Sequence, residues 1–286
     1  MIIVTRIMRT GGTAFWKSIK GNFKDGQCWQ KDMFAKRQYK SVGGLITALK
    51  EGRKFKVKPK VFMHHLPYGV HKLFDEGIEY DYVTFLRDPI RRLISHIYYA
   101  LHIKYSKEYE KQLQESNFFE KQLILQNYLR NMDKDSNDIL PVLEKCIASD
   151  TICNIMTKQL SGLEDLDNIA TNYAVAKGNL YTVNHTSIAP TTEEQMEALL
   201  EAAKYNLKNK YSFIGFQENG SKDHKLLCEV LRWKYRGVGI QNASIKKPNF
   251  NWQHKDVIDA LMEMTKYDIE LFKYALEIRD DQRSSS

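Results

Sequence analysis

The chain has 286 residues, of which 43% are hydrophobic and 27% are charged, which excludes a mainly disordered protein and provides for a large core. The formal net charge of +8 favours anionic partners, such as nucleotides, nucleic acid, acidic glycans or anionic membrane, without choosing among them. The four cysteines and eight histidines show no zinc-ligand spacing, so we expect free thiols in a reducing compartment. We find no signal peptide and no apolar run that could span a membrane, and we expect a soluble, cytoplasmic protein. A chain trimmed of an anchor would have the same sequence.

Short β-type runs alternate with helical patterns along the chain. We predict strands at 2–8, 61–63, 82–86, 179–183 and 211–216, and helices at 14–19, 90–101, 139–147, 151–160, from Thr191 or Thr192 to 207, at 222–233 and at 256–278, with an amphipathic helical region at 107–130. This alternation predicts one α/β domain over residues 1–286, with a mostly parallel sheet flanked by helices and a helical insertion at about 104–175. In such folds ligands bind beyond the carboxyl ends of the strands.

A turn with two glycines follows the first strand, where residues 6–14 read R-I-M-R-T-G-G-T-A. The glycines allow a tight turn and a close approach to a ligand, and the amides that open the next helix favour an anion. Thr10 and Thr13 add hydroxyl donors, and Arg9 adds a forked cation. The cation precedes the glycines, unlike the lysine of the Walker A pattern G-x-x-x-x-G-K-[ST], so an ATPase or kinase is disfavoured. The turn predicts a phosphate or sulfate site; an ordinary strand-to-helix turn is the alternative.

A second pattern that could bind an anion follows the strand at 82–86. Arg87 lies where this strand ends, Pro89 suits the first turn of a helix, and Ser95 comes about two helical turns after Arg87. Arg92 and Ser95 are spaced to share a helix face. Together these side chains could hold a second phosphate, whereas a surface helix rich in arginine is the alternative.

The two patterns together resemble the sulfotransferases that use 3′-phosphoadenosine-5′-phosphosulfate (PAPS), specifically the carbohydrate type that includes heparan sulfate 2-O- and 6-O-sulfotransferases and bacterial members. That family reads about R-[IV]-P-K-T-G-G-T-[ST] near its start and L-R-D-P-x-x-R-x-x-S-x-Y-Y further on. Here Met8 replaces proline, Arg9 replaces lysine and Ala14 replaces the last hydroxyl residue, and one extra residue precedes the tyrosine pair. Segments 154–162 and 206–218 are similar to two later family segments, N-x-Q-T-R-x-L-[SA]-G and N-L-(x)n-F-x-x-V-G-x-x-E, in the same order.

This resemblance implies a P-loop-NTPase-like three-layer fold and a sulfuryl transfer from PAPS to a hydroxyl acceptor, without a metal, that leaves 3′-phosphoadenosine-5′-phosphate (PAP). The first turn would hold the 5′-phosphosulfate and the second the 3′-phosphate. The expected cofactor-binding residues are Arg9, Thr10, Gly11, Gly12, Thr13, Ala14, Arg87, Arg92 and Ser95. The family lysine is thought to stabilise or protonate the leaving phosphate. Since arginine essentially never loses its proton, we expect Arg9 to contribute electrostatically to catalysis.

Residues 63–71, which read M-H-H-L-P-Y-G-V-H, supply the candidate general base. Histidine titrates near neutrality, as a general base requires. Many bacterial family members resemble G-H-[MFL]-P-Y-G-[LV]-H here, which aligns His65 with the base and His71 with the second histidine. His64 is the alternative base, because a one-residue slip of the strand would exchange the side chain that faces the cofactor. Packing of the loop is the non-catalytic interpretation.

No transferable motif identifies the acceptor. The resemblance implies a saccharide or glycan hydroxyl, while a protein tyrosine or a small phenol stays open, and we expect specificity to reside in segments such as 20–60 and 104–150. Two other classes compete: a P-loop-like nucleotide-dependent phosphotransferase and a basic nucleic-acid-binding protein. Basic clusters that could bind nucleic acid, or equally an acidic glycan, are Lys36, Arg37 and Lys40, and Arg53, Lys54, Lys56, Lys58 and Lys60. We expect no nucleic-acid partner, and Lys246 and Lys247 are candidates for the adenosine end of the cofactor.

Overall fold

The computed structural model describes residues 1–24, 27–29, 60–65, 67–73, 79–102, 125, 127–132, 137–150, 152–162, 192–237 and 249–284. Within these ranges the chain is an α/β fold with a sheet in the order β2-β3-β1-β4-β5. The strands are β1 (Ile2–Thr5), β2 (Cys28–Trp29), β3 (Val61–His64), β4 (Asp81–Leu86) and β5 (Tyr211–Phe216). All neighbouring pairs are parallel, so the carboxyl ends of the strands share one edge of the sheet, which we call the carboxyl edge.

Both faces of this sheet are buried, which explains why its strands read as nearly continuous apolar runs. Successive side chains of a strand point to opposite faces, and the core divides accordingly. The residues that face the first core are Ile2, Val4, Val61, Met63, Val83 and Phe85. The intervening residues Ile3, Phe62, Tyr82 and Leu86 face the second core.

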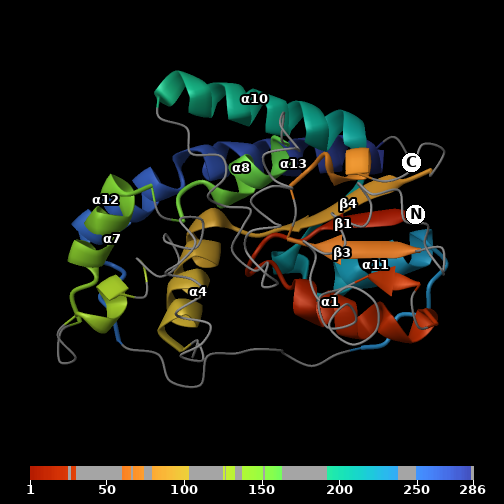
Figure 1. Cartoon of the computed structure of the whole chain (residues 1–286), viewed down its shortest axis with the longest axis horizontal. Helices are drawn as coiled ribbons and strands as arrows, with labels where there is room; N and C mark the ends of the chain where they lie inside the picture. Colours follow the sequence, from red (N-terminus) through yellow and green to blue (C-terminus); the bar gives the residue numbers. More distant parts are fainter. Residues whose placement is uncertain are drawn as a thin grey trace.

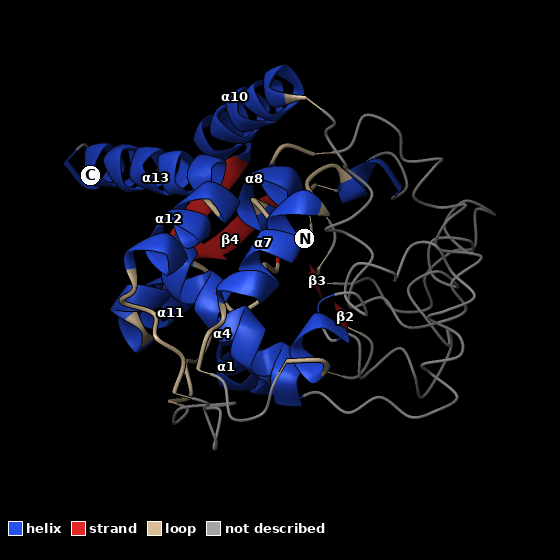
Figure 2. Cartoon of the chain, turned by 90° about the vertical axis from the view of Figure 1, so that its left-hand side faces the viewer, coloured by secondary structure: helices blue, strands red, loops and turns tan. Residues whose placement is uncertain are grey.

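The helices form a layer on each face of the sheet (Figure 1). The first core is covered by α1 (Gly12–Ile19) and α11 (Ser221–Val230). The second core is covered by α8 (Ile155–Leu160), α10 (Glu193–Lys210) and α13 (Lys266–Ser284). Three further helices, α4 (Pro89–His102), α7 (Leu140–Ala148) and α12 (Lys255–Met264), extend that core beyond one end of the sheet (Figure 2). The 3-10 turns are η1 (Lys20–Asn22), η2 (Val70–Leu73) and η4 (Gln217–Asn219).

The structure confirms the prediction of a parallel sheet flanked by helices, and most of the predicted elements. The strands predicted near 2–8, 61–63, 82–86 and 211–216 are β1, β3, β4 and β5. Helix α4 begins at Pro89, whose missing N–H costs nothing in a first turn. Thr192 caps α10, because its hydroxyl accepts a hydrogen bond from the Gln195 amide at 3.2 Å.

Several predictions are wrong in their limits, and one strand was missed. The strand predicted at 2–8 ends at Thr5, and the helix predicted at 222–233 ends at Val230. The helix predicted at 151–160 begins only at Ile155, because Ile152 and Asn154 have φ values of 59° and 48°, in the left-handed region. The helix predicted at 256–278 is two helices, α12 and α13, which meet at Thr265. The two-residue strand β2 lies in a basic stretch for which no strand was predicted.

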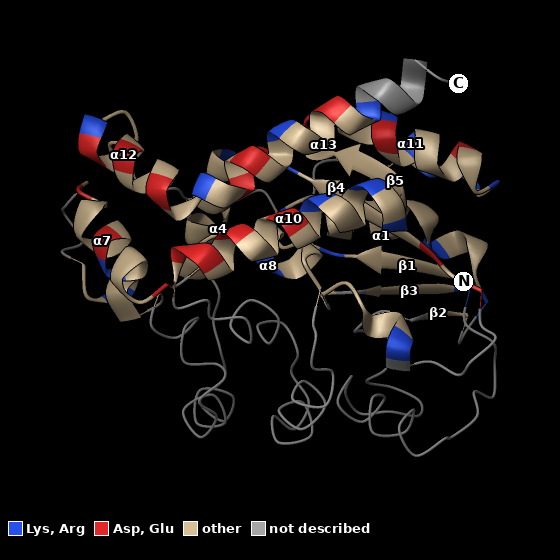
Figure 3. Ribbon diagram, turned by 90° about the horizontal axis from the view of Figure 1, so that it is seen from above, with Lys and Arg blue, Asp and Glu red and all other residues tan. Residues whose placement is uncertain are grey.

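Some predictions fall outside the described residues. These are the strand at 179–183, the clusters Lys36 to Lys40 and Arg53 to Lys58, the pair Lys246–Lys247, and most of the region 107–130 and of the insertion at 104–175. Of the 107–130 region, residues 125 and 127–130 are described and helical. None of the described helices is long and apolar enough to cross a membrane. Acidic and basic side chains are interspersed along α10 and α13, so the positive net charge is not concentrated on these helices (Figure 3).

Candidate functional site

The first turn connects β1 to α1 at the carboxyl edge (Figure 1). Arg9 and Gly11 both have left-handed backbones, with φ values of 69° and 83°. Only glycine adopts this conformation without strain, so Arg9 is held there by its surroundings. Helix α1 begins at Gly12 without a side-chain N-cap and without an acidic residue in its first turn. Its first amides therefore lack intrahelical partners, and the positive end of its dipole favours an anion.

Both glycines of this turn are packed against the protein's own side chains. A Cβ atom on Gly11 would lie 1.8 Å from Gln217 Oε1, and one on Gly12 would lie 2.7 Å from Arg6 Nε. We had expected the glycines to serve the close approach of a ligand. The structure instead packs Gln217, from the turn after β5, and Arg6, from the end of β1, against them.

The second turn, between β4 and α4, meets the first turn at the carboxyl edge. Arg87 Nη1 donates to the Arg9 carbonyl at 3.0 Å, and Arg9 Nε donates to Ser95 Oγ at 3.0 Å. The Arg9 guanidinium also lies 5.1 Å from the ring centroid of Tyr99, one helical turn beyond Ser95. The sequence predicted Arg9 for one turn and Arg87 and Ser95 for the other. The structure brings all three into one cluster.

This cluster concentrates positive charge in a half-buried place. Burial lowers the pKa of Arg9, the neighbouring Arg87 lowers it further, and the Tyr99 hydroxyl opposes both effects. Burial likewise lowers the pKa of Arg87, against the opposing effects of Glu218 and Asp88. Within the described part of the chain neither guanidinium forms an ion pair with a carboxylate. Two adjacent, partly desolvated cations of this kind are stabilised by an anion bound between them.

The two threonines of the first turn differ in what they can offer a ligand. The Thr10 side chain is buried and its hydroxyl donates to the Ile7 carbonyl at 2.9 Å, so its proton is committed to the turn. Thr13 Oγ1 accepts from Arg6 Nη2 at 2.6 Å, which leaves the Thr13 hydroxyl proton to be donated. The predicted donor role therefore suits Thr13, whereas Thr10 stabilises the turn.

Arg92 does not join the cluster at the carboxyl edge. Its side chain is 0% exposed, and its Nη2 lies 3.6 Å from Asp268 Oδ2 on α13. Asp268 also accepts from the Met156 amide at 3.1 Å and from the Thr157 amide at 2.8 Å, both on α8. We had expected Arg92 to bind cofactor with Ser95. Its complete burial against Asp268 makes it part of the framework that joins α4, α8 and α13.

His65 lies beside the first turn, directly after β3. Its Nδ1 is 2.7 Å from the Arg6 carbonyl, which also accepts from Gln159 Nε2 at 3.1 Å. A carbonyl oxygen can only accept, so in the neutral ring Nδ1 carries the proton and Nε2 carries the basic lone pair. The ring is only 5% exposed. Gln159, which the sequence did not identify as a site residue, thus helps to hold the same carbonyl.

The other two histidines of this segment are placed differently. The backbone of His64 ends β3, paired with Thr5, and its side chain lies outside the described part of the structure. His71 lies away from the two turns, where Nδ1 is 3.0 Å from the Tyr82 hydroxyl and the ring stacks on Tyr80 at 4.4 Å. Burial, with smaller effects of Lys72 and Lys210, lowers the pKa of His71 to about 4, so this ring is neutral near pH 7.

The turn after β5 contacts both the first and the second turn. Glu218 Oε1 accepts from the Asp88 amide at 2.9 Å, while Gln217 packs against Gly11. Both lie in the segment 206–218, and the sequence assigned neither of them a role. Nothing in the sequence shows that this turn meets the other two; the strand order does, because β4 lies between β1 and β5.

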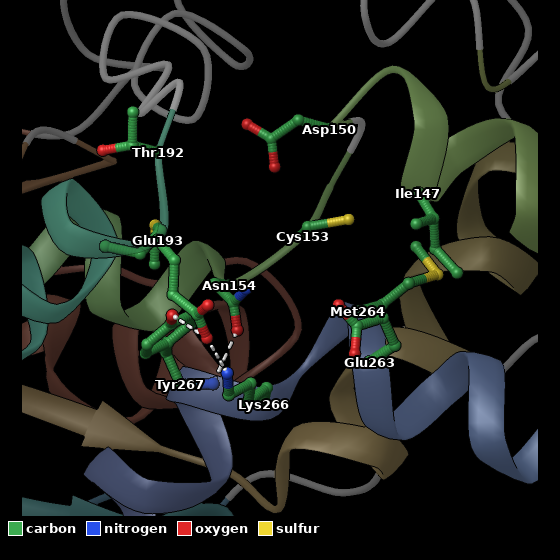
Figure 4. Close-up of a pocket in the computed structure, with 11 residues that line it drawn as sticks. Ile147, Asp150, Cys153, Asn154, Thr192, Glu193, Glu263, Met264, Lys266 and Tyr267 are labelled. Atoms are coloured by element: carbon green, nitrogen blue, oxygen red, sulfur yellow. Dashed lines mark hydrogen bonds and ion pairs between the residues drawn. The ribbon is translucent and has the colours of Figure 1, made fainter.

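A pocket of about 310 Å³ opens elsewhere, among α7, α8, α10 and the junction of α12 with α13 (Figure 4). Its lining includes Asp150, Glu193, Glu263, Lys266 and Tyr267, and Glu193 forms an ion pair with Lys266. None of the residues that the sequence predicted for the site lines this pocket. Its lining carries three carboxylates against one lysine, which disfavours an anion, so the half-buried arginine cluster is the stronger candidate for binding an anion.

Comparison of the chain with models of known protein families gives no match, and neither does comparison with curated protein sequences. A functional assignment therefore depends on the two turns and their geometry. Within the described part of the chain, no three His, Cys, Asp or Glu side chains come together as a metal site would require.

Proposed function

We propose that the protein is a PAPS-dependent sulfotransferase with a P-loop-like fold, which transfers a sulfuryl group to a hydroxyl acceptor, with a saccharide as the first acceptor to test. The observation that carries the proposal is the cluster of Arg9, Arg87 and Ser95, joined by two hydrogen bonds of 3.0 Å. Two neighbouring guanidinium groups that have no carboxylate partner among the described residues fit a nucleotide that carries several negative charges.

The donor set fits PAPS at both of its charged ends. Arg9, Arg87 and Ser95 supply two cations and a hydroxyl, while the uncapped start of α1 supplies amides next to the Thr13 hydroxyl. The first of these two sets suits a phosphate, and the second suits a phosphosulfate. Gly12 and Ala14 would contribute only their backbone amides.

When bound, PAPS would supply the sulfuryl group: a bond from the acceptor oxygen to sulfur forms as the bond from sulfur to the bridging phosphate oxygen breaks, and PAP leaves. His65 Nε2 would take the proton of the acceptor hydroxyl, since Nδ1 donates to the Arg6 carbonyl. The amides of α1, with the positive charge beside them, would stabilise the charge that develops on the leaving phosphate. Arginine keeps its proton, so the leaving phosphate departs as an anion.

The compartment that we propose is the cytoplasm. All four cysteines, Cys28, Cys146, Cys153 and Cys228, are free and buried, in keeping with a reducing environment.

The direct test is a thermal-shift panel with PAP, ATP with Mg²⁺, and NADH. At about one hundred times Kd, PAP should raise Tm by roughly 5–10 °C, while the other two should have little effect. The variant Arg87→Gln should lose most of the shift. Arg91→Gln, which removes the same charge from an exposed side chain of α4, should keep it.

Transfer itself is measured with radiolabelled PAPS and a mixture of neutral and acidic saccharides, with a phenol as a second acceptor class. The absence of any PAP effect would contradict the proposal. Stabilisation by ATP with Mg²⁺ alone would favour a phosphotransferase, and tight, strongly salt-dependent binding of an oligonucleotide would favour a nucleic-acid-binding protein.

A further inference from the structure

Two arginines flank the first turn, and their side chains go to different elements. Arg9 extends to α4, where it contacts Ser95 and Tyr99. Arg6 extends to the start of α1, where its Nη2 donates to Thr13 Oγ1 at 2.6 Å. The sequence pattern drew attention to Arg9, because it stands where the similar family has lysine. The structure places a different guanidinium, that of Arg6, at the start of α1, the helix that follows the turn.

The Arg6 side chain lies directly over the backbone at the start of α1. A Cβ atom on Gly12 would lie 2.7 Å from Nε, 2.8 Å from Cγ and 3.0 Å from Cδ of Arg6. The first turn of α1 contains no acidic residue, so a guanidinium lies beside the positive end of the helix dipole. A cation is disfavoured at a helix N-terminus, and an anion that contacts both the cation and the amides stabilises the arrangement.

The backbone of Arg6 also connects this cation to the proposed base. The Arg6 carbonyl lies 2.7 Å from His65 Nδ1 and 3.1 Å from Gln159 Nε2. A shift of the Arg6 backbone would therefore move the base. The reacting sulfur must lie near both the base and the leaving phosphate, and His65 contacts the residue whose side chain reaches the start of α1, whereas Ser95 contacts Arg9 on α4.

We propose that Arg6 supplies the fixed positive charge at the 5′-phosphosulfate, and that Arg9, with Arg87 and Ser95, binds the 3′-phosphate. This assignment rests on the proposed function. It gives Arg6 the electrostatic role that the sequence resemblance implied for Arg9. Arg6 binds as a fork to phosphosulfate oxygens next to the Thr13 hydroxyl, and its charge stabilises the leaving phosphate.

The experiment measures dissociation constants by isothermal titration calorimetry for ligands that carry one anionic end each. Adenosine 5′-phosphosulfate carries only the 5′ group, adenosine 3′-phosphate carries only the 3′ group, and PAP carries phosphates at both positions. The variants are Arg6→Gln and Arg9→Gln, and Arg91→Gln is the control because its side chain is exposed on α4. Circular dichroism verifies that each variant folds.

Arg6→Gln should weaken the binding of adenosine 5′-phosphosulfate about 10- to 100-fold, as expected for charge-assisted hydrogen bonds. It should change the dissociation constant of adenosine 3′-phosphate less than about threefold. Arg9→Gln should give the reverse pattern, and both variants should weaken the binding of PAP. Arg6→Lys, which keeps the charge but loses the fork, should recover part of the affinity for the 5′ ligand alone. This milder variant tests the same assignment if Arg6→Gln does not fold.

The assignment is overturned if Arg9→Gln weakens the 5′ ligand while Arg6→Gln does not, or if each variant weakens both single-ended ligands equally. If the variants give either of those patterns while the wild-type protein binds PAP, the proposed function stands and only the division of roles between Arg6 and Arg9 is refuted. A wild-type protein that binds none of the three nucleotides refutes both proposals.

Discussion

Ser95 and Arg92 lie three residues apart on α4, yet they belong to two different polar regions of the molecule. Ser95 faces the carboxyl edge of the sheet, where it accepts from Arg9 and remains half-buried. Arg92 is completely buried at the junction of α4, α8 and α13, where Asp268 is its counter-charge. Spacing along a helix predicts which side chains share a side, but not which of them a ligand can reach.

The two regions differ in how their charges are balanced. At the carboxyl edge, Arg9 and Arg87 lie close together and neither forms an ion pair with a described carboxylate. At the junction, Asp268 accepts hydrogen bonds from Met156 and Thr157 and faces Arg92. A cluster of like charges at the edge of the sheet marks a place for a ligand. The buried Arg92–Asp268 ion pair instead holds helices together, although no nitrogen of the Arg92 guanidinium forms a hydrogen bond among the described residues.

The largest effect that we expect concerns catalysis at the carboxyl edge. His65→Asn should lower kcat about 10²- to 10⁴-fold, because asparagine can still donate to the Arg6 carbonyl but cannot take a proton. PAP affinity should change less than about threefold, since His65 is not among the residues that bind the phosphates. The control is His254→Asn, because His254 is an exposed histidine in the C-terminal part of the chain. Turnover at the wild-type rate in His65→Asn would remove His65 as the base.

At the junction we expect the largest loss of stability. Asp268→Ala should lower the free energy of unfolding by about 3–5 kcal/mol, because it leaves Arg92 charged and unpaired in the interior. The matched control is Asp259→Ala, which removes an exposed carboxylate paired with Lys255 and should cost about 0–1 kcal/mol. Urea denaturation followed by circular dichroism measures both. Equal, small losses would show that the junction is not a framework.

The sequence predicted the elements of the carboxyl edge better than their contacts. Apolar runs and the turn residues after them located β1, β3, β4 and β5, because a strand buried on both faces has a recognisable composition. The order of those strands is a long-range property, and it decides that Gln217 packs on Gly11. Strand-end residues could therefore be predicted as a group, but the pairing of Arg9 with Ser95 could not.

The junction could hardly be predicted at all. Its hydrogen bonds join Asp268 to Thr157 and to Met156, more than a hundred residues away along the chain. Asn154 adds to it, since its side chain accepts from the amides of Tyr267 and Asp268 at 3.0 and 3.3 Å. These bonds fix the start of α13 and separate it from α12, and a local pattern of apolar residues carries no sign of them.

Gly11 provides a test of how tightly the first turn is packed. Gly11→Ala should cost about 2–5 kcal/mol, the sum of a left-handed backbone and a clash with Gln217 Oε1, and should also weaken PAP. Gln217→Ala alone is the matched control, because it removes the Gln217 Oε1 atom and leaves the backbone of Gly11 unchanged. The double variant Gly11→Ala with Gln217→Ala should recover the steric part. The same loss from Gly11→Ala with and without the Gln217 side chain would refute the packing.

The smallest expected effect concerns the interior, where His224 is buried against Phe15 and Phe85. Burial lowers its pKa to about 4, with Asp223 opposing, so the unfolded chain binds a proton more readily than the folded one. The stabilising effect is complete above the unfolded pKa of about 6.5 and is lost as the pH falls towards 4.

Between pH 7 and pH 5 this histidine should lower the free energy of unfolding by about 2 kcal/mol. Urea titrations of wild type and His224→Phe at several pH values measure it, and the variant should have the flatter profile. His71, whose pKa is also lowered to about 4, remains in both proteins, so the variant keeps part of the slope. Identical profiles would mean that His224 is solvated, and that the interior beneath α11 is less dry than the junction at Asp268.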